Sequence, residues 1–164
     1  MASAGFWHTV GLTSAGRIVG WGRDNEGQCS RVPTLQEDEV FTMASAGECH
    51  TVGLTSAGRI VGWGSDNEGQ CSRVPTLQEG EVFTMASAGN NHTVGLTSAG
   101  RILGWGRDKE GQCSRVPTLQ EDEVFTMAFA GNSHTVGLTS AGRIVGWGRD
   151  DNGQCSRVPN LQEG

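Results

Sequence analysis

One stretch of the chain recurs four times at a constant spacing. It reads HTVGLTSAGRIVGWG from His8, and near-identical copies begin at His50, His92 and His134. Self-similarity at a period of roughly 20 to 50 residues is typical of repeat architectures, in which each repeat is one supersecondary unit. We therefore expect a single domain, 1–164, built from four repeats. We frame the repeats as 1–42, 43–84, 85–126 and 127–164.

Each repeat has the pattern of a small antiparallel sheet. Residues 50–55 alternate in side-chain size and predict a strand, and residues 59–64 predict a second strand after a Ser-Ala-Gly turn. The turn glycine suits a left-handed position. A third strand is expected over 39–44. The segment 31–35 contains Pro33, which cannot donate to a strand ladder, so it predicts at best an irregular edge strand.

Four such sheets in tandem favour an all-β fold, a β-propeller with four blades of 42 residues per chain. The composition agrees, because 26 of the 164 residues are Gly and thin, closely stacked sheets use glycine well. A linear β-solenoid is the alternative. Solenoid coils have shorter repeats and lack a tight hairpin, so we favour the propeller.

Charge and hydropathy exclude several classes of protein. The net charge of −6 disfavours a nucleic-acid partner or an anionic membrane surface. There is no long apolar segment and no basic-then-apolar leader, so we expect an intracellular, cytoplasmic protein. The five cysteines do not form a disulfide framework, because four of them occur once per repeat and Cys49 is unpaired; we expect reduced thiols.

The residues that recur in every repeat are interpreted as structural. The histidine that begins the strand corresponding to 50–55 in each blade is too far from its copies to share a metal ion, so we predict no metal site. A tryptophan between two glycines is expected to pack between blades. The repeated structural positions are His8, His50, His92, His134, Trp21, Trp63, Trp105, Trp147, Gln28, Gln70, Gln112 and Gln154.

No motif of the sequence indicates catalysis or a cofactor. The loop 24–27 lacks the alternating acidic ligands of a calcium loop and predicts a turn. Ser and His occur only in fourfold copies, and neither a nucleophile elbow nor a phosphate-cradling loop is present. We therefore predict that the protein is not an enzyme and that it binds no cofactor.

The letters of the repeat resemble a known family. The pattern Ala-Gly-x-x-His-Thr-Val-x-Leu at 46–54, Ser-x-Gly-Arg-Ile at 56–60 and Trp-Gly-x-Asp-x-x-Gly-Gln at 63–70 resembles the repeat of the regulator of chromosome condensation family. The resemblance covers all four copies. It implies a β-propeller, commonly of seven blades, and guanine-nucleotide exchange in the founding member, which uses features outside the repeat.

Differences between the copies are concentrated in two loops that should lie at one end of each blade. They are the pair before each histidine and the residue that follows the strand corresponding to 59–64. Phe6 and Trp7 are adjacent aromatic residues in such a loop and are plausible binding hot spots. Relaxed packing at loops is the alternative explanation. The candidate partner-binding residues are Phe6, Trp7, Glu48, Cys49, Asn90, Asn91, Asn132, Ser133, Arg23, Ser65, Arg107 and Arg149.

Three functions are compatible with these patterns. The first is a non-enzymatic scaffold for protein–protein interaction that uses the variable loops. The second is a small-molecule or sugar-binding propeller with pockets near the asparagines and the Trp ring. The third, exchange on a small GTPase, follows from the family resemblance alone. The near-identity of the copies also suggests recent duplication or engineering.

Ring closure gives one further expectation. Four repeats per chain close symmetrically only with a multiple of four blades, and eight blades require about 45° per blade where four would require about 90°. We therefore predict a homodimer in which two chains complete one eight-bladed ring. Each seam would have a shortened first strand, because the first repeat begins at Met1 and the last stops at Gly164.

Overall fold

The computed structural model describes residues 1–159. In these residues the chain forms four antiparallel sheets of three strands each and no helix, so the predicted all-β fold is confirmed. The sheets have the strand orders β1-β2-β3, β4-β5-β6, β7-β8-β9 and β10-β11-β12. The strands are β1 (Ala2–Ala4), β2 (His8–Leu12), β3 (Ile18–Gly22), β4 (Phe41–Ala46), β5 (His50–Thr55), β6 (Ile60–Gly64), β7 (Phe83–Ala88), β8 (His92–Thr97), β9 (Ile102–Gly106), β10 (Phe125–Ala130), β11 (His134–Thr139) and β12 (Ile144–Gly148).

Each sheet is a meander with a fixed register. In the second sheet His50 pairs with Gly64 and Leu54 pairs with Ile60, so β5 and β6 form the predicted hairpin. The turn glycine Gly58 has a φ of 71°, as expected for a left-handed position. The segment 31–35, which we had expected to be an edge strand at best, forms no strand, because its proline leaves a gap in any ladder.

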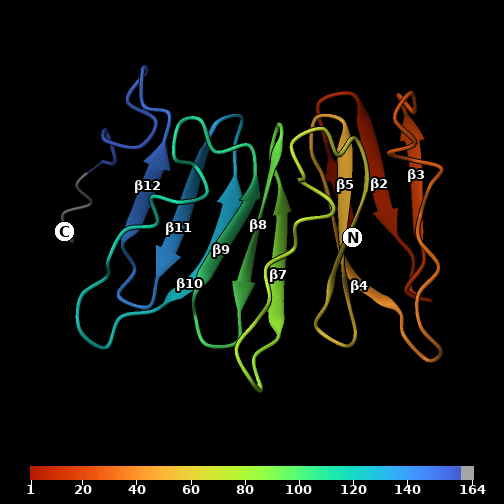
Figure 1. Ribbon diagram of the computed structural model, residues 1–164, viewed down its shortest axis with the longest axis horizontal. Coiled ribbons are helices and arrows are strands. Elements are labelled where there is room, and N and C mark those ends of the chain that lie inside the picture. Colours follow the sequence, from red (N-terminus) through yellow and green to blue (C-terminus); the bar gives the residue numbers. More distant parts are fainter. Residues whose placement is uncertain (160–164) are drawn as a thin grey trace.

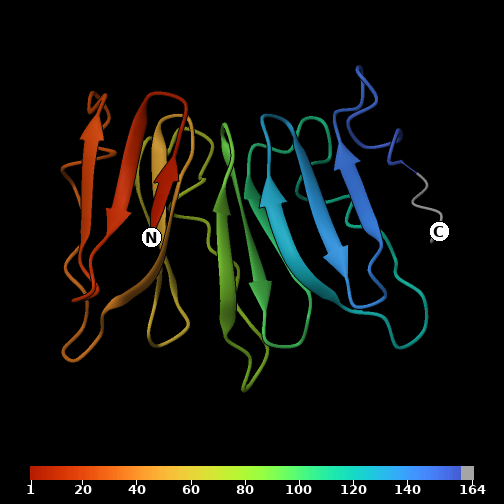
Figure 2. The ribbon, with the colours of Figure 1, turned by 180° about the vertical axis from the view of Figure 1, so that it is seen from behind.

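The four sheets are the blades of a β-propeller and stand side by side in chain order (Figure 1). The first strands of successive blades, β1, β4, β7 and β10, adjoin one another. The first blade (β1–β3) and the fourth blade (β10–β12) lie at opposite ends of the row, and the reverse view shows the same separation (Figure 2). The four blades therefore form an open arc.

The core of the protein lies between blades. Between the second and third blades, Val52 and Ile60 pack against Phe83 and Trp105, all of them 6% exposed or less. The equivalent residues pack between the first and second blades and between the third and fourth. Trp63, Trp105 and Trp147 lie in these clusters between blades, and each is 5% exposed.

Gly95 is a position where the packing requires glycine. A Cβ atom on Gly95 would lie 2.6 Å from two ring carbons of Phe83 and 2.8 Å from Cδ1 of Ile60. Overpacking of this kind costs about 1–3 kcal/mol. We expect Gly95→Ala to lower the free energy of unfolding, measured in urea, by that amount.

The first blade supplies the matched control for this prediction. Gly11 occupies the same strand position as Gly95, but the nearest atom to its Cβ would be Cγ2 of Val19 at 3.4 Å, an ordinary contact. Within one chain, Gly11→Ala should therefore change the free energy of unfolding by less than about 0.5 kcal/mol. Equal losses in the two variants would show that the aromatic ring does not set the requirement for glycine.

Candidate protein-interaction surface

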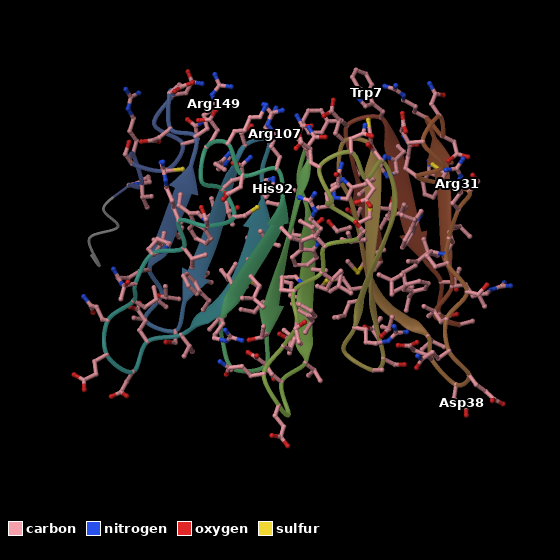
Figure 3. The ribbon with its side chains drawn as sticks, in the orientation of Figure 1. Trp7, Arg31, Asp38, His92, Arg107 and Arg149 are labelled. Carbon is pink, nitrogen blue, oxygen red and sulfur yellow. The ribbon has the colours of Figure 1, made fainter. Side chains whose placement is uncertain are left out.

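The variable loops of each blade meet at one end, as the strand directions predict. The amide of Arg107, after β9, donates to the carbonyl oxygen of Asn91, before β8, at 2.8 Å. The same bond joins Arg23 to Trp7, Ser65 to Cys49, and Arg149 to Ser133. Trp7, Arg107 and Arg149 lie along one edge of the molecule, opposite Asp38 (Figure 3). We call this set of residues, 6–7, 48–49, 90–91, 132–133, 23, 65, 107 and 149, the variable loop surface.

The variable loop surface has an aromatic part in the first repeat. Phe6 is 56% exposed and Trp7 is 55% exposed, although both are large and apolar. The amide of Phe6 donates to the carbonyl oxygen of Gly47 in the next blade at 3.1 Å. The loop backbone is therefore tied to its neighbour while its two rings remain free to contact another molecule.

The third and fourth repeats give the same surface an amide-rich part. Asn91 donates through Nδ2 to Oδ1 of Asn90, Asn90 donates to Oδ1 of Asn132 at 3.1 Å, and Ser133 donates to the same oxygen. This chain of hydrogen bonds crosses from one blade to the next and fixes the three amide groups. Fixed amides present donors and acceptors to a partner with little further ordering.

Two of the candidate residues are less suited to contact. Ser65 is 6% exposed, so the second blade offers no side chain at the position where the others have arginine. Cys49 is a free thiol whose pKa is raised by burial and, less strongly, by the charge of Glu48. Its thiol therefore stays protonated at neutral pH and is a poor nucleophile.

A buried hydrogen-bond relay, which we call the blade staple, joins each blade to the next below this surface. His50 Nε2 lies 3.0 Å from Oγ1 of Thr93, and Thr93 donates from Oγ1 to the carbonyl oxygen of Gln70 at 2.8 Å. Since the hydroxyl proton of Thr93 goes to Gln70, the His50 ring must be the donor to Thr93. Trp105 Nε1 donates to the same carbonyl oxygen at 2.9 Å.

The blade staple occurs at all three interfaces between blades. His8 and Gln28 bind Thr51, and His92 and Gln112 bind Thr135, with the same atoms. His8, His50 and His92 thus each bond to a threonine of the next blade, an arrangement consistent with the structural role that we predict for them. In residues 1–159 no group of three or more His, Cys, Asp or Glu is placed to hold a metal ion.

The loop after the third strand of each blade is a turn, as predicted. Asp66 accepts hydrogen bonds from the amides of Cys71 at 2.7 Å and Ser72 at 3.1 Å through one carboxylate oxygen. Gly69 closes the turn with a φ of 78°. The carboxylate is occupied by its own loop, and the other three repeats show the same pattern.

The repeat matches a family model along most of the chain. The model described as the regulator of chromosome condensation (RCC1) repeat matches residues 2–28, 44–70, 86–112 and 128–154, so the matched positions include every structural residue from His8 to Gln154. The chain belongs to the RCC1 repeat family. The family resemblance of the sequence is thereby confirmed. No curated protein sequence matches the chain as a relative.

Several solved structures share the fold. Prp20p from Saccharomyces cerevisiae superposes with a TM-score of 0.75 at 17% identity, covering 99% of this chain and 47% of that one. Human WBSCR16 superposes with a TM-score of 0.75 at 18% identity, covering 92% of this chain and 48% of that one. The ectodomain of the receptor kinase CR4 from Physcomitrella patens superposes with a TM-score of 0.67 at 27% identity, covering 90% of this chain and 38% of that one. The chain thus spans less than half the length of each of these structures. Within residues 1–159, no helix has the length and apolar character needed to cross a membrane.

Proposed function

We propose that this chain is a non-enzymatic β-propeller scaffold for protein–protein interaction and that the variable loop surface binds the partner. The observation that carries the proposal is the exposure of Phe6 and Trp7, 56% and 55%, on loops whose backbones are held by hydrogen bonds to adjacent segments. Rigidly held aromatic side chains are the residues that most often dominate binding energy at protein interfaces.

The similar structures support the class of partner. One structure of yeast Prp20 shows it bound to Kap60, and another is described with its binding to Gsp1p and histones. A propeller of this fold therefore can bind other proteins, and we propose that the loops decide which partner this chain binds. Because the loop residues differ between the four blades of this chain, we propose a single orientation of the partner, with its apolar part on Phe6 and Trp7 and its polar part on the asparagines.

A binding experiment tests the surface. We expect Phe6→Ala with Trp7→Ala to weaken the affinity for a partner purified with the intact chain by about a hundredfold or more, because each lost hot spot removes about 2 kcal/mol or more. The control variant is Asp38→Ala, since Asp38 lies on the opposite edge (Figure 3). Affinities measured by calorimetry should be unchanged in this control. Equal binding by the double variant and the intact chain would refute the proposed surface.

The sugar-binding alternative has weaker support. Trp63, Trp105 and Trp147 are each 5% exposed, and their ring nitrogens donate to backbone carbonyl oxygens of the preceding repeat. These rings therefore have no free face on which a sugar could stack. Exchange on a small GTPase follows only from the family.

We also propose that the scaffold is a ring of eight blades closed by a second copy of the chain, with repeats 1–42, 43–84, 85–126 and 127–164 as its blades. The open arc and the opposite positions of the first and fourth blades support this proposal (Figure 1). The five free cysteines suit a reducing, cytoplasmic compartment.

A further inference from the structure

Two sheet faces at opposite ends of the arc lie uncovered by other parts of residues 1–159. The N-terminal end face, on the first blade, exposes Val19 by 50% and Trp21 by 55%. The C-terminal end face, on the fourth blade, exposes apolar side chains by 39% to 48%. These side chains are Met127, Phe129, Ile144 and Val158.

The end faces present most of the two halves of one interface that the chain already forms three times. The phenylalanine that the following blade adds to each internal cluster, Phe41, Phe83 or Phe125, has no counterpart on the N-terminal end face. Trp21 is 55% exposed, whereas its three copies are 5% exposed because each packs against the preceding blade. Ile144 is 48% exposed, whereas Ile18, Ile60 and Ile102 are 8%, 6% and 4% exposed because each packs against the following blade. The N-terminal end face therefore has no preceding blade to pack against, and the C-terminal end face presents the surface that such a blade would supply.

We infer that a second copy of this chain docks its N-terminal end face on the C-terminal end face, in the register of the internal interfaces. The inference rests on the proposed ring and names the contacts that close it. In each internal interface the isoleucine of one blade and the tryptophan of the next belong to one apolar cluster. At the seam Ile144 takes this position against Trp21 of the second copy.

The polar half of the internal interface is also present on the two end faces. His134, on the C-terminal end face, corresponds to His50, and Thr9, on the N-terminal end face, corresponds to Thr93. The backbone carbonyl oxygen of Gln154 corresponds to that of Gln70, which accepts from both threonine and tryptophan. Docking in register completes a fourth blade staple from His134 to Thr9, and from Thr9 and Trp21 to Gln154.

A cavity marks the place where this staple would form. It has a volume of about 350 Å³ and is lined by Asn132, Ser133, His134, Arg149, Asn152 and Gln154. At an internal interface the same place is filled by the next blade, since a Cβ atom on Gly64 would lie 3.0 Å from Cβ of Gln28. Gly22 of the second copy would fill the cavity in the same way.

One side chain of the C-terminal end face differs from its counterparts at the internal interfaces. Ser45 and Ser87 accept hydrogen bonds from the amides of Ala88 and Ala130 in the next blade, at 3.0 Å each. The fourth repeat has Phe129 at this position, and its ring is 48% exposed. At the seam Phe129 faces Ala4 of the second copy, so an apolar contact replaces the hydrogen bond.

Head-to-tail docking of two chains gives two identical seams related by a twofold axis, and eight blades. A charge-complementation experiment tests this arrangement. Each seam contains one Trp21 and one Ile144. Trp21→Arg should therefore break both seams through the N-terminal end face, and Ile144→Asp should break both through the C-terminal end face. We therefore expect each variant alone to have the mass of one chain, 17.3 kDa, by light scattering.

Mixing the two variants should restore a dimer. One seam of the mixed dimer is unaltered, and the other pairs the new arginine with the new aspartate. The control is Val82→Asp, because Val82 is 42% exposed but lies on neither end face, and it should leave the mass at about twice 17.3 kDa.

The possible failures are distinguishable. If the intact chain has a mass of 17.3 kDa at micromolar concentration, both the ring and the seam are refuted, while the variable loop surface can still bind its partner. If the intact chain is dimeric but mixing the variants restores no dimer, the head-to-tail seam is refuted. If only one of the two substitutions, Trp21→Arg or Ile144→Asp, breaks the dimer while the other leaves it intact, a face is docked on its own copy and the seam is also refuted.

Discussion

Trp105→Ala is expected to lower the free energy of unfolding by about 3–5 kcal/mol, the usual cost of removing a buried tryptophan. The indole of Trp105 is 5% exposed and its ring centroid lies 6.0 Å from that of Phe83. Its Nε1 atom also donates to the carbonyl oxygen of Gln70 at 2.9 Å. The substitution therefore removes apolar packing and one buried hydrogen bond from the same interface between blades.

Two further variants separate these contributions. Trp105→Phe keeps an aromatic ring and loses the donor, so we expect a smaller loss than that of Trp105→Ala. Trp7→Ala removes a tryptophan that is 55% exposed, and should change the free energy of unfolding by less than about 0.5 kcal/mol. Urea unfolding followed by circular dichroism measures all three. A similar loss in Trp7→Ala and Trp105→Ala would contradict the assignment of the core to the blade interfaces.

The repeat unit was predictable because its local signals agree. The alternation of 50–55, the turn at Gly58 and the second run up to Gly64 all indicate one hairpin, which the structure contains. The predicted start of the second strand at Arg59 was one residue early. Its amide bonds to Oγ1 of Thr55 at 3.3 Å, so this residue still belongs to the turn, and β6 begins at Ile60.

The partners of the recurring side chains could not be predicted from local patterns. The sequence indicated that His50 is structural, but it did not indicate Thr93 as its acceptor, because the two residues are 43 positions apart and join different blades. The only signal was that threonine follows histidine in all four copies. The carbonyl oxygen of Gln70 left no signal in the sequence, since any residue supplies a backbone oxygen.

Acid is expected to destabilise the protein through the blade staples. Burial first, and then neighbouring histidine charges, lowers the pKa of His50 to about 3, and that of His92 to about 4, from 6.5. The Nδ1 atom of each ring has no hydrogen-bond partner among residues 1–159, so a second proton there would be buried without an acceptor. The folded protein consequently holds these rings neutral where the unfolded chain protonates them.

The lowered pKa values of His50 and His92 determine the pH range over which the protein loses stability. A histidine whose pKa is lowered by folding contributes its full stability above pH 6.5 and loses it as the pH falls toward the folded pKa. At pH 5, which is 1.5 units below the unfolded pKa, each of His50 and His92 lowers the free energy of unfolding by about 2 kcal/mol, at 1.36 kcal/mol for each pKa unit. Hydrogen bonds from Arg101 lower the pKa of Glu81 to about 2, so the stability that Glu81 contributes is lost only below about pH 4.5. The stability that the two histidines contribute is lost at higher pH than this.

Urea unfolding at pH 7.5 and pH 5.0 measures this effect, and the Ile144→Asp variant is the suitable protein because dissociation of a ring cannot then contribute. We expect the free energy of unfolding to fall by about 4 kcal/mol between the two pH values. The control protein carries His50→Gln and His92→Gln in addition to Ile144→Asp. Glutamine keeps a neutral donor and does not titrate. This control should be less stable at pH 7.5 and should lose much less stability down to pH 5.0, where only His8, whose pKa burial also lowers, still titrates with an effect on folding. A parent protein with the same stability at both pH values would show that protonation of these histidines does not oppose the packing of the blades.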